Sequence, residues 1–161
     1  MLDICRPMLP GDKVSILRSV LIPIIVALVV LSNHAKSDNL KKFLWQNRLL
    51  VIFAPRDINS NLSLQKEIIA KSYYGSLERQ IRIIEVVVSM PVKVDGRADV
   101  TLEGSKLRQE YGVTKDQFSV VLIGKDGSEK GRWSEPLGPS HLFQIIDKMP
   151  MRMDEMRERG D

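Results

Sequence analysis

Three short and largely apolar runs mark the core of the chain. They span residues 48–54, 81–88 and 118–123, and polar or turn-forming segments bound each of them. Runs of this length that lack the alternation of a half-exposed strand are typical of strands buried on both faces. The pattern therefore predicts three central strands.

A helix is expected between the first two of these strands. Apolar residues recur there at helical spacing, Asn61 or Ser63 can cap the start, and the pattern runs to Tyr74. Gly75 follows, and glycine is common just beyond a helix end, so we expect it to close this helix.

Two further helices are expected, over residues 102–111 and 140–149. Pro150 should end the second of them, because proline has no N–H to donate and crowds the preceding turn. The turn-forming residues 125–128 predict an antiparallel return strand over residues 130–133.

The resulting order is strand, helix, strand, helix, strand, strand, helix. A strand–helix–strand unit implies parallel pairing, and the final hairpin adds an antiparallel edge. This order is the thioredoxin arrangement, so we predict an α/β fold of three layers, with a mixed sheet and helices on both faces.

The N-terminal segment has the pattern of an export signal. Three basic residues precede an apolar run of 12 residues, Val20 to Leu31, which is short for a membrane span and sized for a signal-peptide core. We expect a cleaved signal peptide over residues 1–32, with an uncleaved membrane anchor as the alternative. A flexible leader over residues 33–43 and a domain over residues 44–159 should follow.

Composition narrows the chemistry further. The chain has 161 residues, a net charge of +4 and one cysteine, Cys5, which would leave with the signal. One cysteine excludes a disulfide framework, a cysteine-rich zinc site and a CxxC redox pair. The modest charge and the 6% of aromatic residues give no support for nucleic-acid binding.

Four stretches resemble a thioredoxin-like domain family of unknown function. They are LWQNRLLVIFAPRD (44–57), LRQEYGV (107–113), FSVVLIGKDGSEKGRW (118–133) and LFQIIDKMPMRMDEM (142–156). The family occurs in short exported bacterial proteins and in animal sushi-repeat-containing and matrix-associated secreted proteins. The resemblance implies export and a peroxiredoxin-like sheet. No catalytic activity is established for that family as a whole, so the resemblance says more about fold and export than about function.

Redox-active thioredoxin folds carry a nucleophilic cysteine just after the first central strand, where the next helix begins. The equivalent stretch here, residues 55–63, contains no sulfur. Such folds also place a cis-proline before the third strand, whereas residues 114–118 contain no proline. We therefore expect no thiol exchange, no thiol peroxidase activity and no catalytic residues.

A polar remnant of that cleft is the candidate binding site, formed by Arg56, Asp57, Asn59 and Gln117. A helix N-terminus among such residues can hold an anion or the carboxylate of a partner. The alternative is that Asp57 and Asn59 only order the loop and cap the helix.

Methionines crowd the C-terminal segment, at Met149, Met151, Met153 and Met156. Thioether sulfur suits Cu(I), so a soft-metal site is one hypothesis. The other is packing, in which Met151 and Met156 cover an edge of the core from a short helical turn. In that case Arg152 should reach an acidic or carbonyl partner within the domain.

These observations favour an exported, non-catalytic thioredoxin-like module that binds a protein partner in the cell envelope or outside. We expect no cofactor, no nucleic acid, and membrane contact only through an uncleaved N-terminal segment. The alternative function is a copper-binding or oxidant-scavenging envelope protein that uses the methionine cluster.

Overall fold

A computed structural model describes residues 38–160, which build a six-stranded sheet in the order β4-β3-β2-β1-β5-β6. The strands are β1 (Arg48–Ala54), β2 (Ile81–Val87), β3 (Lys93–Val94), β4 (Arg97–Ala98), β5 (Ser119–Ile123) and β6 (Glu129–Trp133). The helices are η1 (Asp38–Phe43), α2 (Ser60–Lys71), α3 (Tyr73–Glu78), α4 (Gly104–Glu110), α5 (Pro139–Asp147) and α6 (Pro150–Arg159).

The pairing of the central strands confirms the predicted arrangement. β1 runs parallel to β2, and α2 and α3 connect these two strands. β5 pairs antiparallel with β1, and β6 returns antiparallel to β5. A helix between parallel neighbours and a hairpin at the end are the connections that this strand order requires.

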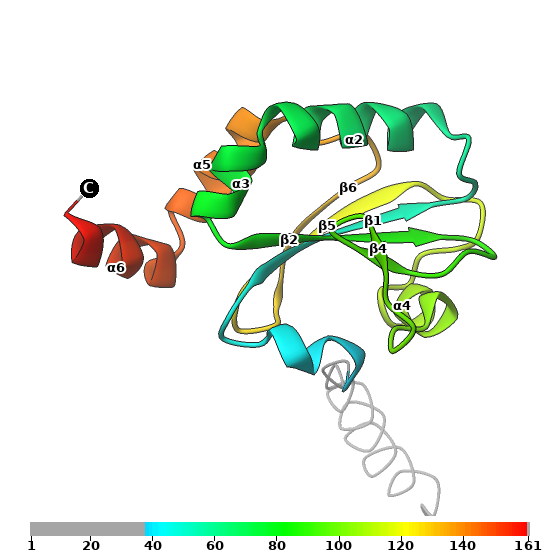
Figure 1. Ribbon diagram of the computed structural model, residues 1–161, viewed down its shortest axis with the longest axis horizontal. Coiled ribbons are helices and arrows are strands. Elements are labelled where there is room, and N and C mark those ends of the chain that lie inside the picture. The colour runs from blue at the N-terminus through cyan, green and yellow to red at the C-terminus, as the bar shows by residue number, and fades with distance from the viewer. Residues whose placement is uncertain (1–37, 161) are drawn as a thin grey trace, which may run out of the picture. The chain divides into compact units, whose positions relative to one another are not determined.

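Apolar residues lie on both faces of β1, which explains why its sequence does not alternate. One face contributes Leu49, Val51 and Phe53 to a core under η1 and α4. The opposite face contributes Leu50, Ile52 and Ala54 to cores under α2 and α5. Figure 1 shows α2, α3 and α5 on one side of the sheet and α4 on the other, so the three-layer prediction is confirmed.

The domain begins earlier than the sequence pattern indicates. The expected flexible leader over residues 33–43 ends in the 3-10 helix η1, where Leu40 and Phe43 are buried against the sheet. These two side chains are three residues apart, so one 3-10 turn places both on the same side. The expected signal peptide lies outside the described residues. Within residues 38–160, no helix is long and apolar enough to cross a membrane.

A small hairpin, β3 and β4, lies between β2 and α4, a segment for which the sequence pattern predicts no strand. β3 and β4 pair through Lys93↔Ala98 and Val94↔Arg97, joined by Asp95 and Gly96 with positive φ angles of 47° and 80°. Positive φ at both central residues is the geometry of the type I′ turns that favour Asp-Gly. Strands of two residues are too short for any periodicity to appear in sequence.

The helix expected to end at Gly75 is instead two helices. α2 ends at Lys71, and α3 then contains Gly75 in its interior. A Cβ atom at Gly75 would lie 2.6 Å from a ring carbon of Phe143 on α5. Gly75 therefore serves the close approach of α3 and α5, and it does not terminate a helix.

Pro150 interrupts the C-terminal helices as predicted. α5 ends at Asp147, and Pro150 is the first residue of α6. Proline fits there because the first N–H groups of a helix have no intrahelical partner. α6 is a helix of 10 residues, however, and exceeds the expected short turn.

Candidate functional site

The polar loop between β1 and α2 lies at the position that a redox cysteine occupies in related folds. Asn59 precedes α2, and its side-chain oxygen accepts a hydrogen bond from the backbone N–H of Leu62 at 3.0 Å. The helix cap is therefore Asn59, and the prediction of Asn61 or Ser63 is wrong. A capping side chain satisfies a backbone N–H that would otherwise lack a partner.

The other members of the predicted cleft do not converge on one point. Arg56 and Asp57 are exposed, and the neighbouring Ile58 is 96% exposed. Gln117 lies at the same end of the sheet, where its side chain accepts a hydrogen bond from the N–H of Thr114 at 3.1 Å. The side chains of Asn59 and Gln117 thus accept hydrogen bonds from backbone N–H groups three residues away, while Arg56 and Asp57 are exposed to solvent.

A buried arginine that the sequence analysis missed holds this end of the sheet together. Arg108 on α4 is only 6% exposed. Its guanidinium donates hydrogen bonds to the carbonyls of Ala54, Val86 and Thr114. These carbonyls belong to the end of β1, to β2 and to the loop before β5, so one side chain fixes three segments around the cleft.

Arg108 makes these bonds without an acidic partner among the described residues. Burial lowers the pKa of its guanidinium from the usual value, because the charged form loses hydration. Its Nε atom is buried without a hydrogen-bond partner. The ring of Phe53, 5.6 Å from the guanidinium carbon, adds a cation–π contact.

A second charged cluster lies at the opposite end of the sheet and anchors α6. Arg152 is the one residue of α6 that is buried, with 1% of its surface exposed. It forms ion pairs with Glu78 of α3 and with Asp147 of α5. Arg79 binds the same Asp147 through two nitrogens, at 2.9 and 2.6 Å. The predicted acidic partner of Arg152 is therefore confirmed.

Glu155 connects α6 to the sheet itself. Its carboxylate accepts two hydrogen bonds from Arg48, at 3.1 and 3.2 Å, and it pairs with Lys125 at 2.7 Å. Arg48 opens β1 and is almost completely buried. It also donates to the backbone carbonyl of Arg79.

This terminal cluster joins the first and the last of the four stretches that carry the family resemblance, residues 44–57 and 142–156. Arg48 belongs to the stretch that starts the domain, and Asp147 and Arg152 belong to the stretch that ends it. The stretches lie about 100 residues apart in sequence, and Glu155 and Arg79 bridge them in space. These arginines and acids together fasten α6 to the sheet.

Acid should weaken this attachment. Hydrogen bonding from Arg152 lowers the pKa of Glu78. Burial alone would raise the pKa of Asp147, but hydrogen bonds from Arg79 and Arg152 outweigh it and lower the pKa. Burial likewise would raise the pKa of Glu155, but hydrogen bonds from Arg48 and Lys125 lower it. Stability from such groups is present above their unfolded pKa, near 4, and disappears as pH falls through the lower folded pKa.

We therefore expect the urea midpoint to stay constant from about pH 7 to about pH 5 and to fall below about pH 4. Asp99, whose pKa the hydrogen bond from Lys42 lowers to about 2, contributes in the same direction. Urea unfolding at several pH values measures this, and hydrogen exchange of α6 amides locates the change. A midpoint that rises on acidification would contradict the assignment.

The methionines of the C-terminal segment do not share one helix face. Met151 is 37% exposed, so the prediction that it covers the core is wrong. Met156 is partly buried, and Met149 packs against the core beneath α5. Met151 and Met153 are two positions apart, about 200° around a helix, and Met153 is also exposed. Arg152 takes the buried position between them.

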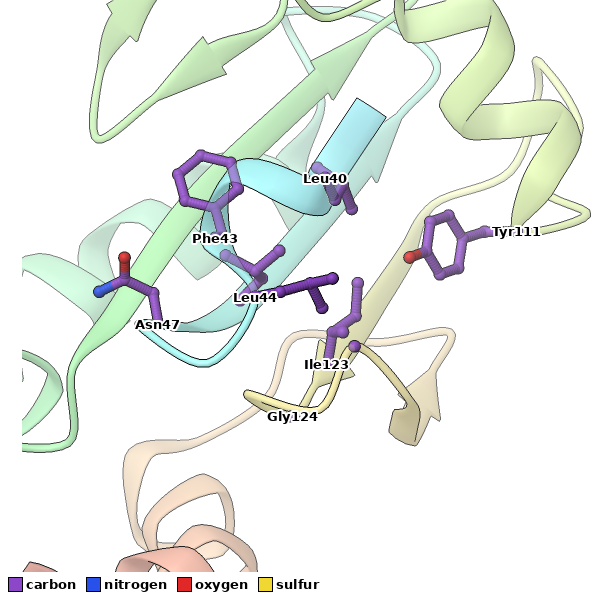
Figure 2. Close-up of a pocket in the computed structure, with 9 residues that line it drawn as sticks. Leu40, Phe43, Leu44, Asn47, Tyr111, Ile123 and Gly124 are labelled. Carbon is purple, nitrogen blue, oxygen red and sulfur yellow. The ribbon is translucent and has the colours of Figure 1, made fainter. Parts of the chain in front are cut away.

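A small pocket lies between η1 and the turn after β5 (Figure 2). Leu40, Phe43 and Leu44 form one wall, and Tyr111 points into the pocket from the end of α4. Burial raises the pKa of the Tyr111 hydroxyl. The cavity volume is about 20 Å³, which is room for one water molecule and not for an organic ligand.

Comparison with known proteins places the described domain among sequence relatives. Residues 39–155 match the family model described as "Domain of unknown function (DUF4174)". The chain is 32% identical over 125 residues to human sushi repeat-containing protein SRPX2, covering 76% of this chain and 27% of that protein. It is 26% identical over 133 residues to zebrafish coiled-coil domain-containing protein 80, covering 73% of this chain and 15% of that protein.

A solved structure supports the fold. Prx1a of Plasmodium yoelii superimposes with a TM-score of 0.50 at 13% sequence identity, covering 74% of this chain and 80% of that one. At this identity the likeness concerns the fold alone. It agrees with the predicted thioredoxin-like, peroxiredoxin-like sheet.

Proposed function

The chain belongs to the DUF4174 family, and from that premise we propose that it is an exported, non-catalytic thioredoxin-like module that acts by binding another protein. The observation that carries the proposal is the loop after β1. Its residues lack sulfur, and Asn59, at the position where the helix begins, caps α2. A thiolate at such a helix start is the group that attacks disulfides and peroxides in redox-active relatives of the fold.

The relation to larger proteins supports a binding role. The match covers about a quarter of the human sushi repeat-containing protein, so the same domain occurs there beside other segments. A domain that recurs in chains of different length, and that lacks the reacting group of its fold, is suited to recognition. Export is supported by the basic residues and the apolar run that precede the domain in sequence.

We expect the full chain to show no turnover in insulin disulfide reduction or in peroxide reduction with a thiol donor. Cys5 is its single cysteine, and it lies outside the described residues. A Cys5→Ser variant is the matched control, because any turnover that it retains must come from the domain. Turnover above background in that variant would overturn the non-catalytic assignment.

Export has its own test. The intact mass of the protein recovered from the cell envelope should correspond to loss of about the first 32 residues. A full-length mass in the membrane fraction would instead establish an uncleaved anchor. Either mass found only in the cytoplasm would contradict export.

A further inference from the structure

An open groove lies at one corner of the sheet, between η1 and the β3–β4 hairpin. Its volume is about 360 Å³. The lining residues are Lys42, Phe43, Arg82, Val94, Arg97, Ala98 and Asp99. The groove is distinct from the polar loop after β1 and from the small pocket beside Tyr111.

The strand register explains why these side chains meet. Ile84 of β2 lies opposite Val94, and Val94 lies opposite Arg97. Directly opposed residues point to the same face of a sheet, as do residues two apart on one strand. Arg82, Val94 and Arg97 therefore share one face of three neighbouring strands, and η1 borders that face with Lys42 and Phe43.

The groove combines an apolar floor with a cationic rim. Phe43 and Val94 are almost fully buried in the core below, while Arg82 and Arg97 are exposed. Lys42 binds Asp99 at 2.5 Å and Thr101 at 2.9 Å, so the single carboxylate of the lining is already neutralised.

The two arginines of the rim differ in their partners. Arg82 pairs with Asp95 at 2.5 Å across the hairpin turn. The side chain of Arg97, a residue of β4, is exposed and forms no hydrogen bond or ion pair within the part of the chain that the structure describes. A guanidinium so placed is available to bind a carboxylate in the paired geometry that arginine favours.

We propose that this groove binds an extended acidic segment of a partner protein, with an apolar side chain over Phe43 and Val94 and carboxylates at Arg97 and Arg82. This inference rests on the proposed binding function and names its surface. Charge complementarity selects an acidic ligand, the apolar floor favours a peptide over a polysaccharide, and the small number of cations disfavours an anionic membrane. Tight binding of polyanions uses many more cationic contacts than three.

The test uses the full chain and fluorescein-labelled peptides in an anisotropy titration. The probe is EDVEDLED, in which acidic residues flank two aliphatic ones. EDGEDGED lacks the aliphatic residues, and QNVQNLQN lacks the charges. Vesicles of phosphatidylglycerol provide the membrane arm.

Arg97→Glu is the decisive variant, because the exposed side chain makes no contact that folding requires. We expect it to weaken EDVEDLED binding about tenfold or more, since it removes one attraction and adds a repulsion. Lys115→Glu is the matched control. It makes the same charge change on the exposed loop that precedes β5, and Lys115 does not line the groove. It should change the affinity by less than about twofold.

Several results would overturn the inference. If EDVEDLED binds wild type and Arg97→Glu equally well, the groove is not the binding site. If EDVEDLED does not bind at all, the proposal is wrong. If EDGEDGED binds as tightly as EDVEDLED, the apolar floor does not contribute to binding. If QNVQNLQN binds as tightly, the arginines do not contribute. Vesicle binding that Arg97→Glu abolishes, without peptide binding, would assign the groove to lipid. None of these outcomes restores thiol chemistry, so the groove can fail while the non-catalytic function stands.

Discussion

Replacing Arg152 by alanine should lower the free energy of unfolding by about 3 kcal/mol, because it removes a buried charge that two helices share. Arg152 joins Glu78 of α3 and Asp147 of α5 to α6. Both carboxylates are partly exposed, so water can solvate them after the change, which keeps the expected loss near the lower end for buried pairs. Urea unfolding measures the loss, and hydrogen exchange should show faster exchange of α6 amides.

Arg157 on the same helix provides the matched control. It pairs with Asp154 at 3.0 Å, but its side chain is 77% exposed. Exposed pairs of this kind contribute little, so Arg157→Ala should change stability by less than about 0.5 kcal/mol. Equal effects of the two substitutions would show that burial of Arg152 is not what attaches α6.

Arg108→Ala should destabilise the domain by about 3–5 kcal/mol, since it removes three hydrogen bonds from a buried charged group that links three segments. The carbonyls of Ala54 and Val86 belong to neighbouring central strands, and water has little access to them. The carbonyls of Ala54 and Thr114 keep a second, backbone donor, from Val88 and Gln117, so the loss comes from the missing links between segments and from lost packing. Thermal and urea unfolding of the variant measure it.

Arg108→Lys separates charge from geometry. Lysine keeps the positive charge, but its single nitrogen cannot reach carbonyls on three separate segments. We expect it to recover less than half of the lost stability. Full recovery would mean that the charge alone is required at this position, and it would contradict the role of the guanidinium as a link between segments.

The sequence predicted the central architecture because the central strands are buried on both faces. Residues such as Leu49 and Leu50 must both be apolar when each contacts a different core, and that requirement is visible without a structure. Pro150 was equally informative, because its covalent geometry excludes a helix interior. The partner of Arg152 could be expected from charge alone.

Other features left no signal of that kind. Arg108 lies beside Leu107 on an ordinary helix, and its partners are carbonyls, which every residue possesses. Gly75 resembled a helix terminus because the ring of Phe143, which excludes a side chain there, lies 68 residues further along the chain. Met151 resembled a core residue because methionine and arginine alternate, and composition does not reveal that the arginine is the buried one.

The charged attachment of α6 also has a kinetic consequence. The bond between Arg48 and Glu155 closes a separation of 107 residues, and the bond between Arg152 and Glu78 closes 74. Contacts that close such long loops form late in folding, because the chain must lose loop entropy before they can form. Contacts that are absent from the transition state act mainly on the rate of unfolding. We therefore expect loss of the α6 attachment to shorten the lifetime of the folded molecule, with little effect on its folding rate.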